Sequence, residues 1–155
     1  MRDGGLEGWQ HLPADALQGL VGASTAAAGQ MEIYNPMGGI FITRVRGHLT
    51  TAIAHEWVKV SAVLWPRAEQ YDAFNDWSAM TGYDSESRKI LTEWALAHQA
   101  QLASLVSCAG DRLVRMGLTV TSAVMALSRL EMSVVDRDEF VAKLRSTMRA
   151  RGRLT

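Results

Sequence analysis

Strand-like and helix-like patterns alternate along most of this chain, and the alternation limits the folds open to it. From residue 31 onward, two strand patterns lead to a helix, and three strand–helix pairs follow. A helix between two strands forms a crossover, which makes those strands parallel. The turn Asn35–Gly39 separates the first two strands, which predicts an antiparallel hairpin. The order ββαβαβαβα predicts an α/β fold with a mixed sheet of four or five strands and helices mostly on one face.

Hydrophobic periodicity places the individual elements. The five expected strands cover residues 31–34, 40–46, 69–77, 103–109 and 130–135. The expected helices cover residues 50–65, 85–101, 112–127 and 136–148. In the third helix, apolar residues recur along one face at Leu113, Met116, Val120, Val124 and Leu127.

The chain divides into three parts by composition. Residues 1–30 are rich in Gly and Ala, which is typical of a flexible arm, although a short helix over 13–21 is an alternative. Residues 31–148 form the expected domain, and residues 149–155 a basic, frayed tail. We therefore expect a truncation that starts near Met31 to melt within a few degrees of the full chain. Trp9 is a candidate anchor of the arm, on this domain or on another copy.

Composition excludes several classes of protein. The 155 residues carry 16 basic and 16 acidic side chains, which argues against a dedicated nucleic-acid binder. A hydrophobic content of 48% argues against a disordered chain. No apolar run is long enough for a membrane span, and no secretory signal is evident. With a single cysteine, Cys108, these features predict a cytoplasmic protein. The arginines near the C-terminus suit a solvated helix end, and the alternative is a contact with nucleic acid or an acidic partner.

Catalytic and metal-binding patterns are not found in the sequence. The four histidines are far apart, and His55-Glu56 lacks the second histidine of a zinc protease helix. Neither glycine-rich phosphate-binding motif occurs. Cys108 lies in the middle of an expected strand, where a thiol is more often inert than nucleophilic. We expect no metal, no cofactor and no enzymatic activity.

The segment from Asp76 to Leu91 is the most distinctive one for function. It is expected to end a strand near Trp77, turn at Gly82 and start a helix at Ser85. Asp84, Ser85, Glu86 and Ser87 crowd that helix start, and we expect all four to be accessible to solvent. Such a surface suits a protein partner more than it suits catalysis.

The element order and this segment resemble the STAS domain, in particular its SpoIIAA-like relatives, over residues 31–144. Asp76, Ser78, Asp84 and Ser85 match the loop that anti-sigma-factor antagonists carry, which reads approximately D-L-S-G-V-x-F-I-D-S-S-G-L. Glu86 occupies the place of the serine that the family phosphorylates.

The resemblance implies a role for the charge of Glu86. Its carboxylate would stand permanently where the family adds a phosphate, with about half the charge of a phosphate group. The alternative is that Glu86 only favours the helix start through the helix dipole. Ser87 stands where the family has Gly, and Ser85 and Ser87 are candidate phosphoacceptors if the register differs by one.

The resemblance also implies a function. The expectation is a non-enzymatic STAS-like protein-interaction module in cytoplasmic bacterial-type signalling. Its partner-binding residues would be Asp84, Ser85, Glu86, Ser87 and Arg88. The partner would be an anti-sigma-like or kinase-like protein or a second copy in a homo-oligomer, without nucleic acid or membrane. The alternative is a carrier of a lipid or another small molecule, as in the related SEC14 group.

Overall fold

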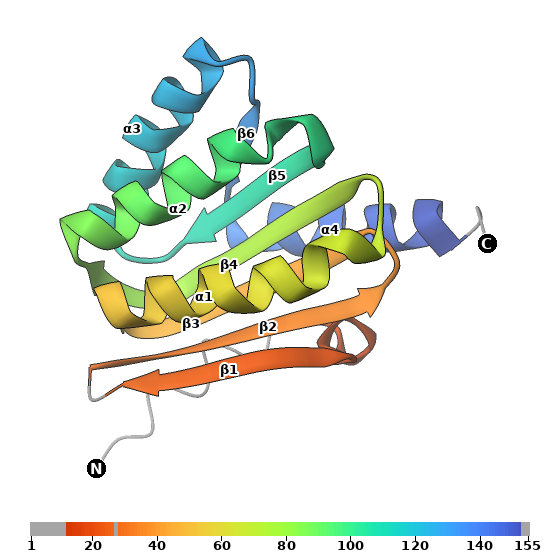
Figure 1. Ribbon diagram of the computed structural model, residues 1–155, viewed down its shortest axis with the longest axis horizontal. Coiled ribbons are helices and arrows are strands. Elements are labelled where there is room, and N and C mark those ends of the chain that lie inside the picture. The colour runs from red at the N-terminus through yellow and green to blue at the C-terminus, as the bar shows by residue number, and fades with distance from the viewer. Residues whose placement is uncertain (1–11, 27, 153–155) are drawn as a thin grey trace.

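The computed structural model describes residues 12–26 and 28–152, which form a six-stranded mixed sheet (Figure 1). The strands are β1 (Leu20–Ala26), β2 (Gly29–Met37), β3 (Ile40–Leu49), β4 (Tyr71–Tyr83), β5 (Leu102–Ala109) and β6 (Met132–Val135). The helices are α1 (Thr51–Leu64), α2 (Ser85–Ala97), α3 (Arg112–Leu127) and α4 (Arg137–Gly152). Short 3-10 helices cover Ala14–Leu17, Trp65–Arg67 and Gln99–Gln101.

Strands lie in the sheet in the same order as in the chain, from β1 to β6. β1 pairs with β2 and β2 with β3 in antiparallel orientation, whereas β3, β4, β5 and β6 are parallel to one another. The parallel part follows from the crossovers, since α1, α2 and α3 each carry the chain to the next strand. The predicted α/β class and the order from β2 onward are confirmed. The sheet has one strand more than the four or five predicted.

The additional strand corrects the prediction of a flexible arm for residues 20–26 of the predicted range 1–30. β1 pairs with β2 from Leu20 to Ala26, and the helix predicted over 13–21 is limited to the 3-10 turn Ala14–Leu17. Gly22 shows why this strand is poor in large residues, because a Cβ there would lie 2.7 Å from Val60 of α1. At Gly22, the small residue that indicated flexibility is therefore needed for packing against α1. Residues 1–11, with Trp9, lie outside the described part of the chain.

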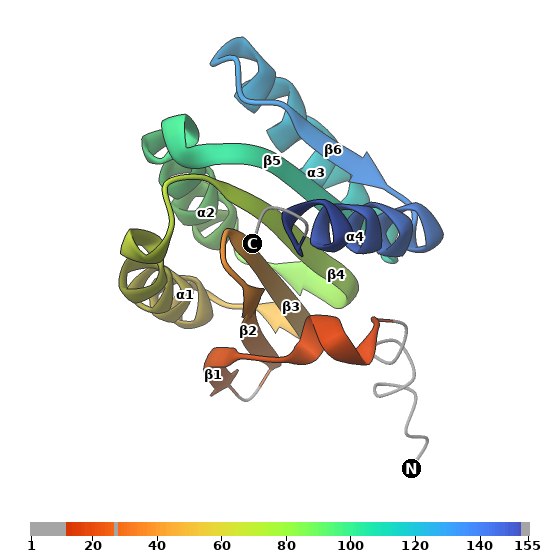
Figure 2. The ribbon, with the colours of Figure 1, turned by 90° about the vertical axis from the view of Figure 1, so that its right-hand side faces the viewer.

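The two faces of the sheet are covered by different helices (Figure 2). α1, α2 and α3 pack on one face around Phe41, whose ring is within 6.4 Å of the rings of Trp57, Trp65, Tyr71 and Trp94. α4 and the first 3-10 turn cover the other face, where Phe140 meets Phe74 edge to face at 5.7 Å.

α4 also corrects the expected tail, since it continues to Gly152. Arg151 Nε donates to Asp72 Oδ2 over 2.6 Å, which fastens the end of the helix to β4. No helix among residues 12–26 and 28–152 is both long and apolar enough to cross a membrane.

β4 is longer than predicted. It was expected to end near Trp77 and turn at Gly82, but it stays paired with β3 up to Tyr83. Two register shifts between β3 and β4 interrupt the regular alternation of side chains, and Met80 is buried between them. The irregular alternation made this half of the strand look like a loop. Its consequence is that α2 begins directly at the end of a rigid strand.

α3 places its regular apolar stripe on the outside. Leu113, Met116, Val120, Val124 and Leu127 are 44–88% exposed. The helix buries a neighbouring face instead: Val114, Gly117, Leu118, Thr121 and Met125. Gly117 allows this close approach, since a Cβ there would lie 2.2 Å from the hydroxyl oxygen of Tyr83 at the end of β4.

Candidate functional site

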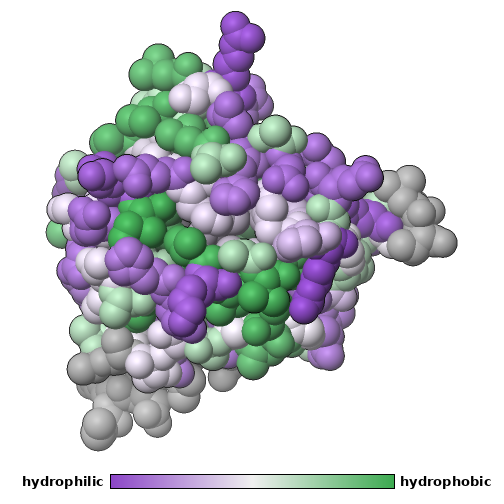
Figure 3. Space-filling view, in the orientation of Figure 1, coloured by the Kyte–Doolittle hydropathy of each residue, from purple (hydrophilic) through white to green (hydrophobic). Residues whose placement is uncertain are grey.

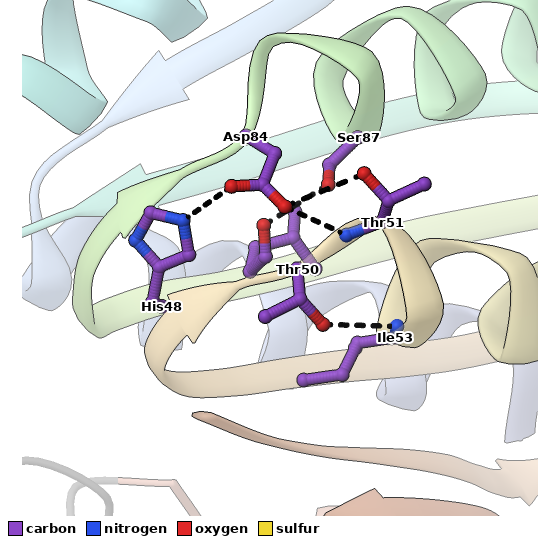
Figure 4. A network of polar contacts seen from close by, with 7 residues as sticks. His48, Thr50, Thr51, Ile53, Asp84 and Ser87 are labelled. Atoms are coloured by element: carbon purple, nitrogen blue, oxygen red, sulfur yellow. Dashed lines mark hydrogen bonds and ion pairs between the residues drawn. The ribbon is translucent and has the colours of Figure 1, made fainter. Parts of the chain in front are cut away.

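The Asp84 carboxylate joins three segments at one edge of the sheet (Figure 4). His48 Nε2, near the end of β3, donates to Asp84 Oδ1 over 2.8 Å. At the start of α1, the Thr51 backbone N–H donates to Asp84 Oδ2 over 3.0 Å, and the Thr51 hydroxyl over 3.3 Å. Asp84 is the N-cap residue of α2, but its side chain caps α1 instead of its own helix.

Two further contacts connect the same segments. The Asp84 backbone N–H and the Ser87 hydroxyl both donate to the Leu49 carbonyl oxygen, each over 3.0 Å. Thr50 caps α1 in the ordinary way, with its hydroxyl oxygen accepting from the Ile53 N–H. The N-termini of α1 and α2 are thus fixed to each other and to the end of β3.

His48 and Thr51 lower the pKa of Asp84 below its ordinary value. The hydrogen bond from His48 is the largest cause and the backbone N–H of Thr51 the second, and both favour the charged carboxylate. A lowered folded-state pKa means that this contribution to stability is complete above the unfolded pKa of about 4. It is lost as pH falls through the folded pKa.

We therefore expect Asp84→Asn to lower the melting temperature near pH 7, with the difference from the wild type shrinking below about pH 4. Thermal scans of both proteins between pH 2 and pH 7 test this. Glu86→Gln is the matched control, because it removes a carboxylate from the same turn, where the side chain is exposed. A gap between wild type and Asp84→Asn that is constant over this range would contradict the assignment.

The structure separates the predicted site residues into two groups. Ser85, Glu86 and Arg88 are exposed, as expected, on the first turn of α2. Asp84 is half-buried in the contacts above, and Ser87 is fully buried, so the expected exposure of all four residues is wrong for Ser87. Ser87 faces back toward β3 because its hydroxyl bonds the Leu49 carbonyl. Of the two candidate phosphoacceptors, only Ser85 is at the surface.

A groove of about 410 Å³ runs between α2 and α3 beside these exposed residues. Its α2 wall is mostly polar and charged, and its α3 wall contributes Thr121 and Val124. The residues of the α2 wall are Ser85, Glu86, Arg88, Lys89, Thr92 and Glu93. The predicted partner residues Ser85, Glu86 and Arg88 therefore border a groove that offers both charge and apolar surface.

A smaller apolar cavity, of about 50 Å³, lies between the sheet and the helices α2 and α3. Trp57, Trp77, Trp94 and Tyr83 are among the side chains that line it. The indole N–H of Trp77 is buried and has no hydrogen-bond partner among the described residues. This N–H could donate to a ligand that carries one acceptor on an apolar body.

The first part of the motif is structural. Asp76 is fully buried, and its Oδ1 accepts from the Ser78 hydroxyl over 2.6 Å and from the Cys108 thiol over 3.4 Å. Burial, followed by the neighbouring Asp76 carboxylate, raises the pKa of the Cys108 thiol far above its ordinary value. The thiol therefore stays protonated, which suits a core residue and not a nucleophile.

The role of His48 was missed by sequence reasoning. A signal was present, because β3 and β4 are parallel and adjacent, so that the residues at their carboxyl ends meet at one edge of the sheet. His48 at the end of one strand and Asp84 just after the next are thereby brought together.

No family model and no curated protein matches the chain. A solved structure does: an uncharacterized protein of the DUF3478 family with a SpoIIAA-like fold, from Shewanella loihica PV-4. The TM-score is 0.54 at 14% identity, over 78% of this chain and 97% of that one. The likeness shows that the fold is SpoIIAA-like, and the STAS/SpoIIAA-like prediction is confirmed at that level.

Proposed function

We propose that this SpoIIAA-like domain is a non-enzymatic protein-interaction module of cytoplasmic bacterial-type signalling, which presents the first turn of α2 to a protein partner. The supporting observation is the position of Ser85, Glu86 and Arg88. All three are exposed beside a groove whose opposite wall is partly apolar. The partner is a segment with complementary charges for α2 and an apolar side chain for the Val124 wall.

Rigidity of the helix start supports this role. Asp84 and Ser87 hold the first turn of α2 against β3 and α1 through their hydrogen bonds. A surface that is already ordered loses little entropy when a partner binds. The residues that were predicted to contact the partner thus divide into two groups. Asp84 and Ser87 support the surface, and Ser85, Glu86 and Arg88 form it.

The affinity of the partner would depend on the charge of the first turn of α2. Ser85 is the first residue of α2, where the positive end of the helix dipole favours an anion. A phosphate on Ser85 would add to the charge of Glu86 and lie one turn from Arg88. We propose Ser85 as the phosphoacceptor if the surface is switched by a kinase.

Glu86→Lys is expected to weaken binding of the partner at least tenfold, because it reverses the charge at the centre of the surface. The change costs only about 0.3–1 kcal/mol of dipole stabilisation, so the melting temperature should fall by a few degrees at most. Asp138→Lys is the matched control, since Asp138 is an exposed acidic residue in the first turn of α4. α4 lies on the opposite face of the sheet.

A photo-crosslinking residue at position 89, used in cells of the source organism, would identify the partner. Binding is then measured with both purified proteins. The proposal requires weakening by Glu86→Lys and normal binding by Asp138→Lys. Equal binding by wild type and both variants would place the partner on another surface.

The apolar cavity favours a second candidate function, a carrier of a molecule of a few heavy atoms, since about 50 Å³ is well below the roughly 300–1,000 Å³ of an ordinary ligand pocket. Its apolar lining and the buried indole N–H of Trp77 suit a ligand with one acceptor atom. Native mass spectrometry of the purified chain separates the two functions. A retained small molecule that Trp77→Phe releases supports the carrier, and a bare chain supports the interaction module.

A further inference from the structure

The exposed stripe of α3 has no cover in the monomer. It consists of Leu113, Met116, Val120, Val124 and Leu127 and is visible as a green patch at the upper left of Figure 3. At 44–88% exposure, these side chains present on the order of 500 Å² of apolar surface, at the upper end of what a monomer shows. A standard interface buries about 800 Å² per partner, so the stripe would supply much of one.

The spacing of the stripe indicates a helix as its partner. Leu113, Met116, Val120, Ala123 and Leu127 follow one another at intervals of three and four residues, which is the heptad pattern of a helix–helix seam. Val124 widens the seam on the side of α2. The buried face of α3 does not use these positions, because Val114, Leu118 and Met125 pack on the sheet.

The spacing of the apolar residues in the stripe is also symmetric about its centre. Its intervals are three, four, four and three residues, centred on Val120. An antiparallel two-fold pair of α3 helices would therefore place Leu113 against the partner's Leu127, Met116 against the partner's Val124, and Val120 against its own copy. A two-fold interface requires this self-complementarity, whereas a partner of different sequence does not.

Charges agree with the same arrangement. Residues 116–128 contain no charged side chain, so two copies can meet without burying an ion. Arg112 would lie beside the last turn of the partner's α3, where the helix dipole is negative. A lipid surface fits less well, since residues 116–128 carry no cation. The neighbouring groove adds no net positive charge either, because Arg88 and Lys89 are balanced there by Glu86 and Glu93.

We propose that the chain forms a two-fold dimer through antiparallel packing of α3 against α3 of a second copy. This interface is distinct from the first turn of α2, on which the proposed function depends. The dimer would present two copies of the α2 surface. Val124 belongs to both surfaces. Glu86 is not part of the stripe and Val120 does not line the groove, so Glu86→Lys tests the proposed function and Val120→Glu tests the dimer separately.

Sedimentation velocity of the full chain over a range of concentrations tests the dimer. We expect wild type to dimerise and Val120→Glu to dimerise at least roughly 100-fold more weakly, because two carboxylates would face each other at the two-fold axis. Val63→Glu is the matched control, since Val63 on α1 is 65% exposed and lies outside the stripe. It should dimerise as wild type does.

Disulfide trapping tests the geometry. Oxidation should crosslink Val120→Cys to itself, and Leu113→Cys to Leu127→Cys in a mixture. Leu113→Cys alone should not crosslink, because the two copies of residue 113 would lie about 21 Å apart. Wild type serves as the background, since Cys108 is buried.

A wild-type chain that stays monomeric at all concentrations would overturn the proposal. If that monomer binds vesicles of phosphatidylcholine and phosphatidylglycerol through the stripe, the stripe is a lipid-binding surface instead. Equal weakening by Val63→Glu would overturn the assignment to α3. Crosslinking of Leu113→Cys alone would overturn the antiparallel arrangement.

Discussion

Deletion of residues 1–28 is expected to destabilise the domain by at least roughly 3 kcal/mol, or about 6–12 °C in melting temperature. The deletion removes β1 and exposes the edge of β2. It also removes Leu12 and Ala16, which are 5% and 0% exposed on the face shared with α4. The sequence alone predicted a change of only a few degrees, and the paired strand is the reason for the larger value.

Thermal and denaturant unfolding measure this contribution in three chains: the full chain, a chain that begins at Leu12 and a chain that begins at Gly29. The matched control starts at Leu12 and keeps β1, so that the difference between the two truncations isolates residues 12–28. Gly22→Val tests the strand without deletion, because its side chain would collide with Val60 of α1. If the chain that begins at Gly29 has the same melting temperature as the chain that begins at Leu12, residues 12–28, and with them β1, contribute nothing to stability.

Phe41→Ala should cost about 3–5 kcal/mol, which corresponds to roughly 6–20 °C in melting temperature. Phe41 is 1% exposed and contacts the rings of Trp57, Trp65, Tyr71 and Trp94. Alanine would leave a cavity that these large rings cannot close without leaving their favoured rotamers.

Phe41→Leu is the control that keeps most of the volume, and it should cost roughly 1–2 kcal/mol, since only the aromatic contacts and a little packing are lost. Denaturant unfolding gives both values. The near-ultraviolet circular dichroism of the tryptophans should change more for alanine than for leucine. Equal losses for the two variants would mean that the volume at position 41 is not what stabilises this cluster.

Most of the fold could be predicted from the sequence, because its regular elements carry a strong period. β3, α1 and β5 show simple apolar patterns, and the short loops between them leave few topologies. β1 could not be predicted, since Gly22, Ala23 and Ser24 give no strand period, and at Gly22 the neighbouring helix α1 leaves no room for a larger side chain. The second half of β4 was missed because register shifts break the alternation.

The site was predictable only in part. Glu86 and Arg88 were located correctly, since the start of a helix was evident from the sequence. The burial of Ser87 depends on the Leu49 carbonyl, which belongs to a residue 38 positions earlier. The outward stripe of α3 could not be told from a core stripe either. The apolar arc of α3 spans about 200° on a helical wheel, and periodicity does not say which part meets the sheet.

The strand order has a consequence for how the chain can fold during synthesis. Each strand from β2 to β6 joins the sheet beside the strand made just before it, so no gap must be held open for a later segment. The growing sheet can therefore assemble as the chain leaves the ribosome. One surface is covered later than the others, because Phe74 on β4 packs against Phe140 of α4, which follows all six strands in the chain. Nascent chains would expose this apolar surface until α4 has been synthesised, and during that interval a chaperone would find the largest apolar surface to bind.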